Sequence, residues 1–326
     1  FFGSFASVII HRLKSKEGGI IAGRSKCPNC QTTLGVTDLM PIVSYFFRLG
    51  KCGYCKQKIS PIYPLLELST GILFFLVGYN LIDFSMILTI NYIEIIKLFY
   101  FLFLAFITII FVFYDILYLE INEGVLFIGI LFSGIIIVIQ TIFPDVLIIP
   151  TFSRNYEGIL GYELYGLIGL FIVIILSLYI IILKGLKEIY DMLILTFCIL
   201  SIFVLKEYFN IDIYHIPVTS SILGLLFIFT FLFLQIVVSK GTWMGGGDLR
   251  IAILMGLILG YSYSFVGIMI AYILGSIIGL FIILLQKLKK KETISTIIPF
   301  GPFLGLGLFI SILFQKEINE WLFYYL

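Results

Sequence analysis

Charged residues are scarce in this chain. Asp, Glu, Lys and Arg make up 12% of its 326 residues, whereas a soluble domain carries about a quarter. Hydrophobic residues make up 61%, and the mean hydropathy is +1.15. This balance excludes an ordinary soluble protein and predicts an all-α polytopic membrane protein.

Apolar runs of bilayer length, about 20 residues each, follow one another along the chain. They predict about 8–10 transmembrane helices. The first run begins at Phe1 and is interpreted as a truncated helix, and the short, Gly-rich run 249–262 predicts a half-helix or one arm of a hairpin. The expected spans are 1–11, 65–82, 97–115, 124–142, 163–183, 189–205, 217–238, 249–262, 264–286 and 297–314.

Three parts follow from this pattern. Residues 1–11 are the truncated first helix, 12–64 form a polar insertion, and 65–326 form a multi-span membrane domain with extra spans at about 143–216.

The distribution of Lys and Arg predicts the orientation. If 12–64 lies in the cytoplasm, the loops at 184–191, 239–250 and 287–292 must lie there too, and this side receives 17 of the 21 basic residues. The positive-inside rule predicts such an asymmetry. The same alternation places Asp115 and Asp248 at the cytoplasmic ends of their spans.

Cysteine is also rare, and four of the five lie in the insertion. Cys27, Cys30, Cys52 and Cys55 form two C-x2-C pairs separated by 21 residues. Two such pairs can complete a tetrahedral zinc site, which would stabilise a segment with few large apolar residues. Redox-active pairs or disulfides remain alternatives, although a cytoplasmic location disfavours disulfides. Cys198 lies in an apolar run and is interpreted as a packing residue.

The two carboxylates suggest a shared site. Charges beside lipid are costly and usually functional, and two adjacent carboxylates sharing one proton can activate a water for peptide hydrolysis. Asp248 follows Gly245, Gly246 and Gly247, which would let an extended substrate backbone approach closely. Alone, however, an Asp at a span end is more often an interfacial residue, and a Gly triplet is more often a tight turn.

The insertion carries a formal charge of +7. This charge suits the anionic headgroups of the lipid bilayer. Topology explains it adequately, so no nucleic-acid partner is expected.

Several motifs occur in the order known from one family. The opening block is similar to GSFxNVVIxRLP, the cysteine pairs to its two zinc knuckles, and later segments to IS-x-x-YP-x-x-E, GxGDxK and IPFGPFL. The chain therefore resembles the type IV prepilin peptidases, which are leader peptidase/N-methyltransferases and GxGD-type membrane aspartyl proteases. The matching segments are 3–13, 25–30, 50–55, 59–67, 245–250 and 298–304.

The resemblance implies that Asp115 and Asp248 are the catalytic residues and that Gly245, Gly246 and Gly247 contact substrate. The stretch after Asp115 has Asn122 and Glu123 where the family has Pro and then Asp or Asn, and Arg250 replaces the usual Lys. Asp145 also follows a Phe-Pro pair, but the topology puts it on the opposite side, so it is rejected as catalytic.

The resemblance further implies an activity and a location. The enzyme would lie in the bacterial cytoplasmic (inner) membrane and remove basic leaders from prepilins or pseudopilins of type IV pili or type II secretion. N-methylation of the new amino terminus with S-adenosylmethionine is a further step that the resemblance allows, although no soluble fold for that cofactor is visible. Alternatives from other classes are a transporter with a zinc-stapled cytoplasmic loop and a zinc-bearing scaffold without chemistry.

Overall fold

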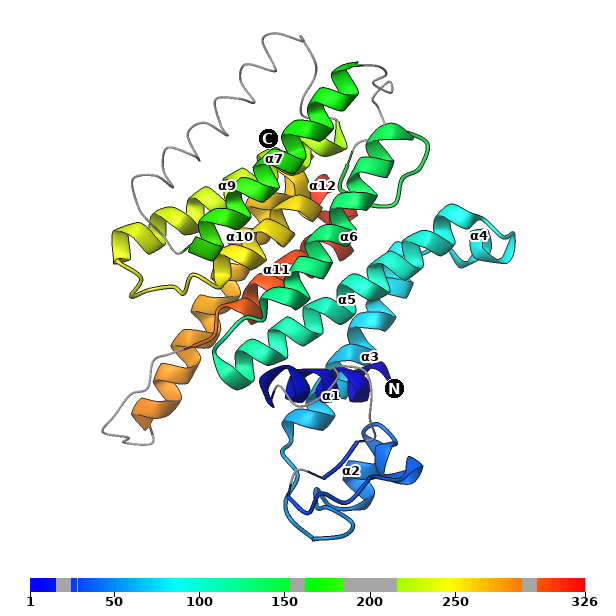
Figure 1. The fold of residues 1–326 in the computed structure, drawn as a ribbon, viewed down its shortest axis with the longest axis vertical. Helices are drawn as coiled ribbons and strands as arrows, with labels where there is room; N and C mark the ends of the chain where they lie inside the picture. Colours follow the sequence, from blue (N-terminus) through cyan, green and yellow to red (C-terminus); the bar gives the residue numbers. More distant parts are fainter. Residues whose placement is uncertain (16–24, 28, 153–161, 185–215, 289–297, 326) are drawn as a thin grey trace.

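The described chain is a helical bundle with a small irregular insertion at one end (Figure 1). The computed structural model describes residues 1–15, 25–27, 29–152, 162–184, 216–288 and 298–325. The predicted span 189–205, with Cys198, lies outside them. The elements are α1 (Phe2–Ser15), η1 (Val36–Leu39), α2 (Val43–Phe47), α3 (Ile62–Leu81), α4 (Phe84–Leu88), α5 (Tyr92–Tyr118), α6 (Glu123–Ile142), α7 (Tyr162–Lys184), α9 (Pro217–Ser239), α10 (Asp248–Leu288), α11 (Gly301–Leu313) and α12 (Gln315–Tyr325).

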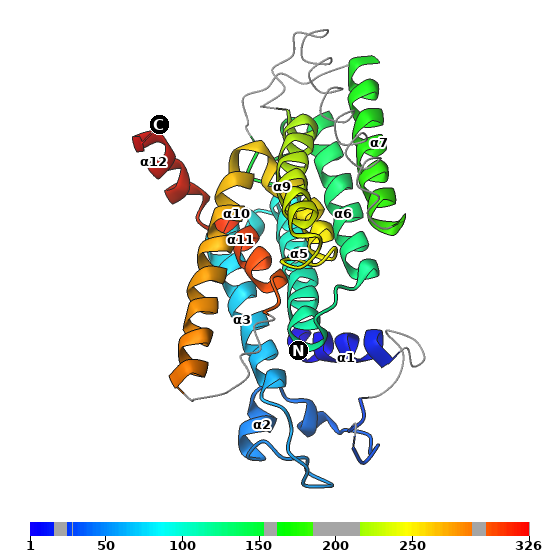
Figure 2. The same ribbon diagram turned by 90° about the vertical axis from the view of Figure 1, so that its left-hand side faces the viewer.

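Helix length and hydropathy confirm the prediction of an all-α membrane protein. Among the described residues, α3, α5, α6, α9 and α10 are long and apolar enough to cross a bilayer, and α11 is a shorter apolar helix. Their boundaries agree with the predicted spans to within a few residues. α1 has 14 residues; it packs on α3 and α5 and lies across their ends (Figures 1 and 2).

Polar residues fix the ends of α5 and α6. The Asn91 side chain accepts hydrogen bonds from the backbone N–H groups of Ile93 and Glu94 at the start of α5. The Asn122 side chain does the same for Val125 in α6, at 3.2 Å. Such caps satisfy N–H groups that have no partner inside the helix. They limit the α5–α6 connection to a tight turn, so these two helices run antiparallel.

α10 is two helical arms joined at Gly260. This residue has φ +62° and ψ −170°, which breaks the helix. A Cβ atom on Gly267 would lie 2.5 Å from a methyl group of Leu259 and 2.6 Å from Met255, so the second arm folds back on the first. The structure thus has the hairpin arm expected from the Gly-rich run.

Hydroxyl groups satisfy the backbone at this bend. Ser221 donates to the carbonyl of Leu257 at 2.9 Å, and Thr151 donates to that of Ile258 at 2.7 Å. The Ser220 hydroxyl accepts from the N–H of Tyr261 at 3.1 Å. An interrupted helix is tolerated at membrane depth only when neighbours satisfy its free backbone groups in this way.

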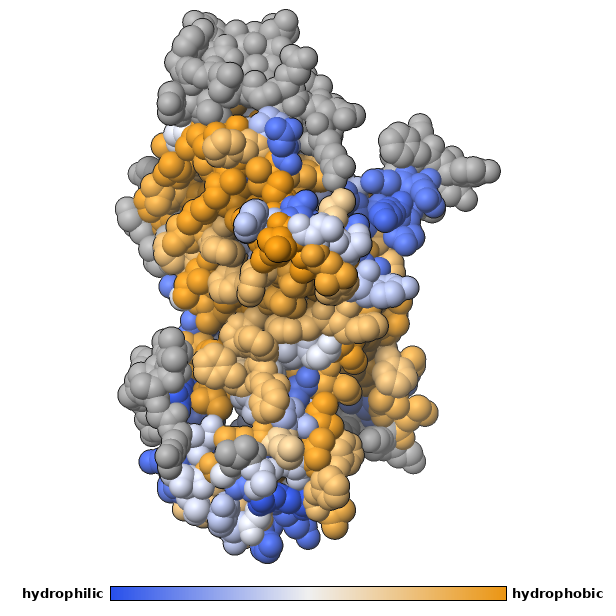
Figure 3. Space-filling model, turned by 90° about the vertical axis from the view of Figure 1, so that its right-hand side faces the viewer, coloured by the Kyte–Doolittle hydropathy of each residue, from blue (hydrophilic) through white to orange (hydrophobic). Residues whose placement is uncertain are grey.

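Apolar side chains cover the middle of the molecule, and polar residues gather over the insertion at its lower end (Figure 3). Large exposed apolar side chains along the helices include Phe99, Phe127, Leu131, Ile277, Leu280 and Phe281. Apolar surface this extensive fits contact with lipid rather than water.

Candidate functional site

Asp115 lies in the last turn of α5. The N–H of Leu119 donates to the backbone carbonyl of Asp115 at 2.8 Å, and Leu119 ends the helix in the left-handed conformation with φ +54°. The Asp115 residue is 6% exposed.

Asp248 is the first residue of α10, and it is 7% exposed. Its backbone N–H donates to the carbonyl of Gly245 at 3.2 Å, which closes the turn that leads into the helix. Asp115 and Asp248 are 133 residues apart in the chain, yet their carboxyl groups lie close enough to repel one another electrostatically. The structure therefore brings the two predicted residues together at one end of the bundle.

Gly301, at the start of α11, contacts Asp115 directly. Its backbone N–H donates to Asp115 Oδ2 at 3.0 Å in a buried position. A Cβ atom on Gly301 would lie 2.6 Å from that oxygen and 3.2 Å from a methyl group of Ile251 in the first turn of α10. Gly301 thus lies between the two Asp-bearing segments. Gly301 belongs to the matching segment 298–304, but the sequence alone indicates no role for it.

The three glycines before Asp248 have different surroundings. A Cβ atom on Gly246 would meet nothing within 4 Å, and one on Gly245 would make only an ordinary contact. A Cβ atom on Gly247, in contrast, would lie 2.9 Å from the Ile121 side chain in the α5–α6 turn. Gly247 therefore lets this segment pack on the turn beside Asp115, while Gly245 and Gly246 leave open space. Their contact with substrate stays a prediction.

An ion pair joins the helix that begins with Asp248 to the helix that follows Asp115 in the chain. Arg250 Nη2 lies 2.5 Å from Glu123 Oε1, which links the first turn of α10 to that of α6. Arg250 Nε is buried and has no hydrogen-bond partner among the described residues. Both positions were noted in the motifs, but their contact could not be predicted from them. Asp145, the rejected candidate, is exposed just after the opposite end of α6.

The four cysteines of the insertion form one cluster built from two equivalent turns. The N–H of Cys27 donates to the carbonyl of Thr32 at 3.0 Å, and that of Cys52 donates to Gln57 at 2.8 Å. In each turn the residue four positions later, Gln31 or Lys56, has positive φ, and an isolated antiparallel bridge closes each turn.

The cluster fits a tetrahedral metal ion. All four Sγ atoms lie within 4.8 Å of one another, with 3.9 Å between those of Cys27 and Cys55. Zn–S bonds of about 2.3 Å in a tetrahedron imply S···S distances of roughly 3.8 Å, whereas a disulfide would need about 2.05 Å.

Local hydrogen bonds prepare two of these thiols for metal binding. Hydrogen bonding by Thr32 lowers the pKa of Cys30 to about 6. The backbone amides of Cys55 and Tyr54 lower the pKa of Cys52. Both shifts favour the thiolate form that a metal binds.

Polar contacts hold the insertion together and attach it to the bundle. Asp38 forms an ion pair with Arg48 and accepts a hydrogen bond from the Tyr54 hydroxyl at 3.1 Å. Glu67 Oε2, in the second turn of α3, accepts from the N–H of Ile42 at 2.7 Å. Glu67 therefore connects α3 to the insertion.

Comparison with known proteins gives the site its context. Residues 1–81 match the family model described as the bacterial peptidase A24 N-terminal domain. The first quarter of this chain is similar to that domain. The matched segment contains all four cysteines and ends before Asp115. The match therefore bears on the cysteine-containing insertion and does not cover the aspartate pair. No solved structure gave a significant match to the chain.

Several proteins that are similar to this chain share the same name. A prepilin leader peptidase/N-methyltransferase of Klebsiella pneumoniae is 43% identical over 83 residues, which cover 24% of this chain and 36% of that protein. The enzyme of the same name from Bacillus subtilis (strain 168) is 49% identical over 59 residues, or 18% and 24% of the two chains. That of Neisseria gonorrhoeae is 34% identical over 101 residues, or 24% and 35%. The matched parts thus span about a quarter to a third of these relatives' lengths.

Proposed function

We propose that this protein is a membrane-embedded aspartic endopeptidase that removes basic leaders from type IV prepilins or pseudopilins. The observation that carries the proposal is the pairing of Asp115 and Asp248, two buried carboxyl groups from distant segments at one end of a membrane bundle. The names of the relatives, prepilin leader peptidase/N-methyltransferase, supply the substrate class.

In this mechanism the two carboxyl groups share one proton and hold one water between them. The ionised group takes a proton from the water as its oxygen attacks the peptide carbonyl, and the protonated group donates to the developing oxyanion. The N–H of Gly301 holds one oxygen of Asp115 in a fixed orientation. The open space at Gly245 and Gly246 would receive the substrate backbone in extended form.

The uneven distribution of Lys and Arg between the two sides supports cleavage at the cytoplasmic face of a bacterial inner membrane. A prepilin leader is basic and stays in the cytoplasm, while the apolar helix that follows it lies in the bilayer. Its scissile bond therefore lies at the cytoplasmic membrane edge, where the positive-inside rule also places the aspartates.

The insertion has a structural part in this proposal. Zinc bound by Cys27, Cys30, Cys52 and Cys55 would hold the two turns together in a segment with little apolar core. N-methylation of the new amino terminus, with S-adenosylmethionine as donor, is a second candidate activity, because the relatives' names include it.

The positions of the buried carboxylates fit a transporter less well than they fit a peptidase. Transport through the bilayer needs ionisable groups along the pathway, near its midplane. Among the described residues, the buried carboxylates are Glu94, Asp115 and Asp248, and each lies within one turn of a helix end.

The test is leader cleavage by Asp115→Asn and Asp248→Asn variants in reconstituted membranes. Each amide removes a titratable group of the pair, so cleavage should fall to background while the protein still inserts. Asp145→Asn is the matched control, because Asp145 is exposed near the opposite end of α6, and it should cleave at the wild-type rate. Mass spectrometry of a co-reconstituted prepilin measures the outcome. Full cleavage by either Asp115→Asn or Asp248→Asn would overturn the proposal.

A further inference from the structure

The insertion presents an apolar surface that none of the functions assigned above uses. In α2, Val43, Phe46 and Phe47 are 47%, 68% and 85% exposed, and they share one face because they are three and four residues apart. Leu49, just after the helix, is 84% exposed. These four residues form an apolar ridge. Adjacent large apolar side chains of this kind mark an interaction surface, whereas single ones do not.

The fold fixes which side of α2 is turned outward. The Tyr45 side chain packs inward on Gly50, where a Cβ atom would lie 3.0 Å from the Tyr45 hydroxyl oxygen. Leu49 ends this segment with φ +52°, a conformation that leucine rarely adopts and that glycine or asparagine usually provides. The chain therefore keeps a large apolar side chain at an exposed position where the backbone conformation favours a smaller residue.

The turn that follows the ridge is basic and has no acidic partner. Lys51, Lys56 and Lys58 are exposed and make no ion pair with any residue that the structure describes. Asp38 is the one acidic residue in the described part of the insertion, and it is already paired with Arg48. An apolar ridge beside uncompensated lysines is typical of a surface that binds an anionic lipid interface.

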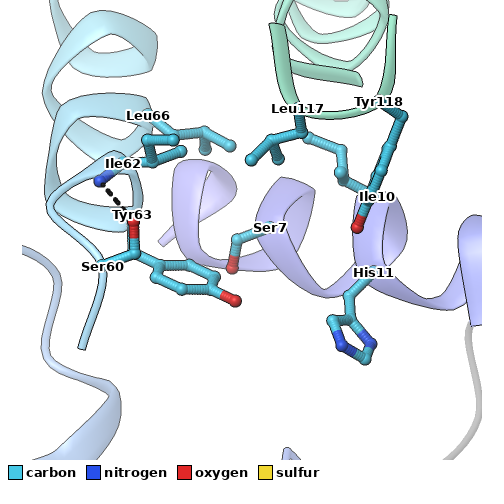
Figure 4. Close-up of a pocket in the computed structure, with 9 residues that line it drawn as sticks. All are labelled: Ser7, Ile10, His11, Ser60, Ile62, Tyr63, Leu66, Leu117 and Tyr118. Atoms are coloured by element: carbon cyan, nitrogen blue, oxygen red, sulfur yellow. Dashed lines mark hydrogen bonds between the residues drawn. The ribbon is translucent and has the colours of Figure 1, made fainter. Parts of the chain in front are cut away.

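The ridge lies close to the point where α3 enters the bilayer. The N–H of Ile42, just before α2, donates to Glu67 Oε2 at 2.7 Å, which places the start of α2 beside the second turn of α3. At the start of α3, Tyr63 lies with His11 and Tyr118 around a small pocket between α1, α3 and α5 (Figure 4). Tyrosine is enriched where membrane helices meet water. These contacts place the ridge near the level of the headgroups.

α10 indicates the same level for the membrane surface. Its exposed side chains Leu280, Phe281 and Leu284 continue the apolar surface almost to Lys287, near the end of the helix. The last turns of α10 reach about the level of the start of α3 (Figures 1 and 2). Because such apolar surface fits lipid rather than water, the bilayer extends to the end of the bundle that carries the ridge.

We propose that the apolar ridge is a membrane-docking surface that binds anionic phospholipid. Its aromatic side chains insert among the headgroups and upper acyl chains of the adjacent leaflet, and the lysines after the ridge contact phosphate groups. A prepilin leader fits this surface poorly, because under the proposed function the leader is basic too. A second copy of the chain would bring the same lysines against one another. Docking holds the insertion against the bilayer on the side of the molecule that carries the dyad.

The experiment places the photoreactive residue p-benzoylphenylalanine at position 47 of the zinc-loaded protein. The protein is reconstituted in vesicles of phosphatidylcholine, with or without phosphatidylglycerol, and prepilin is added. After illumination, mass spectrometry should identify phospholipid as the covalent partner of position 47, with a higher yield in the anionic vesicles. The matched control carries the same residue at position 33, where Thr33 is exposed in the other, polar turn, and it should give no lipid adduct. Equal lipid adducts at both positions, or an adduct with prepilin or a second copy in place of lipid, would overturn the proposal.

A charge variant tests the lysines separately. Each lysine near an anionic surface strengthens binding about fivefold. Combining Lys51→Gln, Lys56→Gln and Lys58→Gln should therefore lower the lipid adduct at position 47 in anionic vesicles to the yield in neutral vesicles, with zinc content unchanged. A yield that does not depend on phosphatidylglycerol in the parent protein, or that keeps its full dependence in the triple variant, would contradict anionic lipid as the ligand. Neither measurement requires cleavage, so failure here would leave the proposed peptidase intact.

Discussion

At the scale of single residues, the site depends on how closely backbone can approach Asp115. The Gly301 N–H reaches Asp115 Oδ2 because no side chain separates them, and the same glycine borders Ile251. Any side chain at this position must displace either the carboxylate or the first turn of α10. Gly301 is therefore a positioning residue for the dyad.

A Gly301→Ala substitution should slow leader cleavage. The new Cβ would lie 2.6 Å from Asp115 Oδ2, so the carboxylate has to rotate or α11 has to shift. Misplacing a catalytic group on this scale costs on the order of 100-fold in rate. The measurement is the cleavage rate of a reconstituted prepilin, with the KM for the substrate determined in parallel.

Gly71→Ala, in α3, is the control for this substitution. A Cβ atom at Gly71 meets nothing within 4 Å, so this variant should keep the wild-type rate and thermal stability. The rate loss in Gly301→Ala should appear mainly in kcat, because the dyad rather than the substrate cleft is displaced. Wild-type kcat in Gly301→Ala would show that the carboxylate tolerates the shift.

Residue identity alone predicted part of this site. Four cysteines in two pairs, and an Asp after three glycines, are patterns with a direct chemical reason, and the structure places the members of each near their expected partners. Gly301 gave no comparable signal, because the chain contains 30 glycines. Its role depends on a contact with a residue 186 positions earlier, which no local pattern encodes.

At the scale of elements, the insertion consists of two matching turns that share a single metal-binding cluster. Each turn has only a few backbone hydrogen bonds of its own, and the exposed side chains around them include Phe46, Phe47 and Leu49. Packing is therefore too sparse to fix the relative position of the turns. We expect the metal to do so.

Cys52→Ser should release the zinc and expose the insertion to protease. Cys52 is buried in the cluster, and three remaining ligands bind zinc more weakly than four. Metal content per protein, measured by mass spectrometry, should fall from one zinc to near zero, with new proteolytic cuts confined to residues 25–60. Acidification should have the same effect, because protons compete with zinc for thiolates. Lys58→Gln, which changes an exposed side chain in the same turn, should keep its zinc.

The positions of helices such as α5 and α6 could be predicted from the length of their apolar runs. For α10, the sequence predicted that a break would occur but not the residue at which it occurs. The Gly-rich run indicated a short arm, but the bend occurs at Gly260 because hydroxyls of Thr151, Ser220 and Ser221 satisfy the broken backbone there. These hydroxyls come from other parts of the chain, so local sequence could not locate the bend.

At the scale of the whole molecule, the two ends of the helical bundle differ both in the segments that lie there and in their basic residues. The insertion, the α5–α6 turn with Asp115 and the segment before Asp248 lie towards one end, whereas α4 lies at the other (Figure 1). Basic residues gather at the first end, among them Lys14, Arg48, Lys51, Lys56, Lys58, Lys240 and Arg250. At the α4 end, Lys97 is paired with Glu94 at 3.2 Å and is thereby neutralised.

This asymmetry predicts which end faces the cytoplasm, and labelling of single introduced cysteines can test it. Thr242→Cys lies in the exposed segment before Asp248, and Thr89→Cys lies in the exposed residues after α4. In intact cells with a permeabilised outer membrane, an impermeant maleimide should label Thr89→Cys but not Thr242→Cys, and both should react once the inner membrane is opened. The parent protein, with its five native cysteines, gives the background. Labelling of Thr242→Cys in intact cells would place the aspartates on the outer face, where a leader retained in the cytoplasm could not reach them.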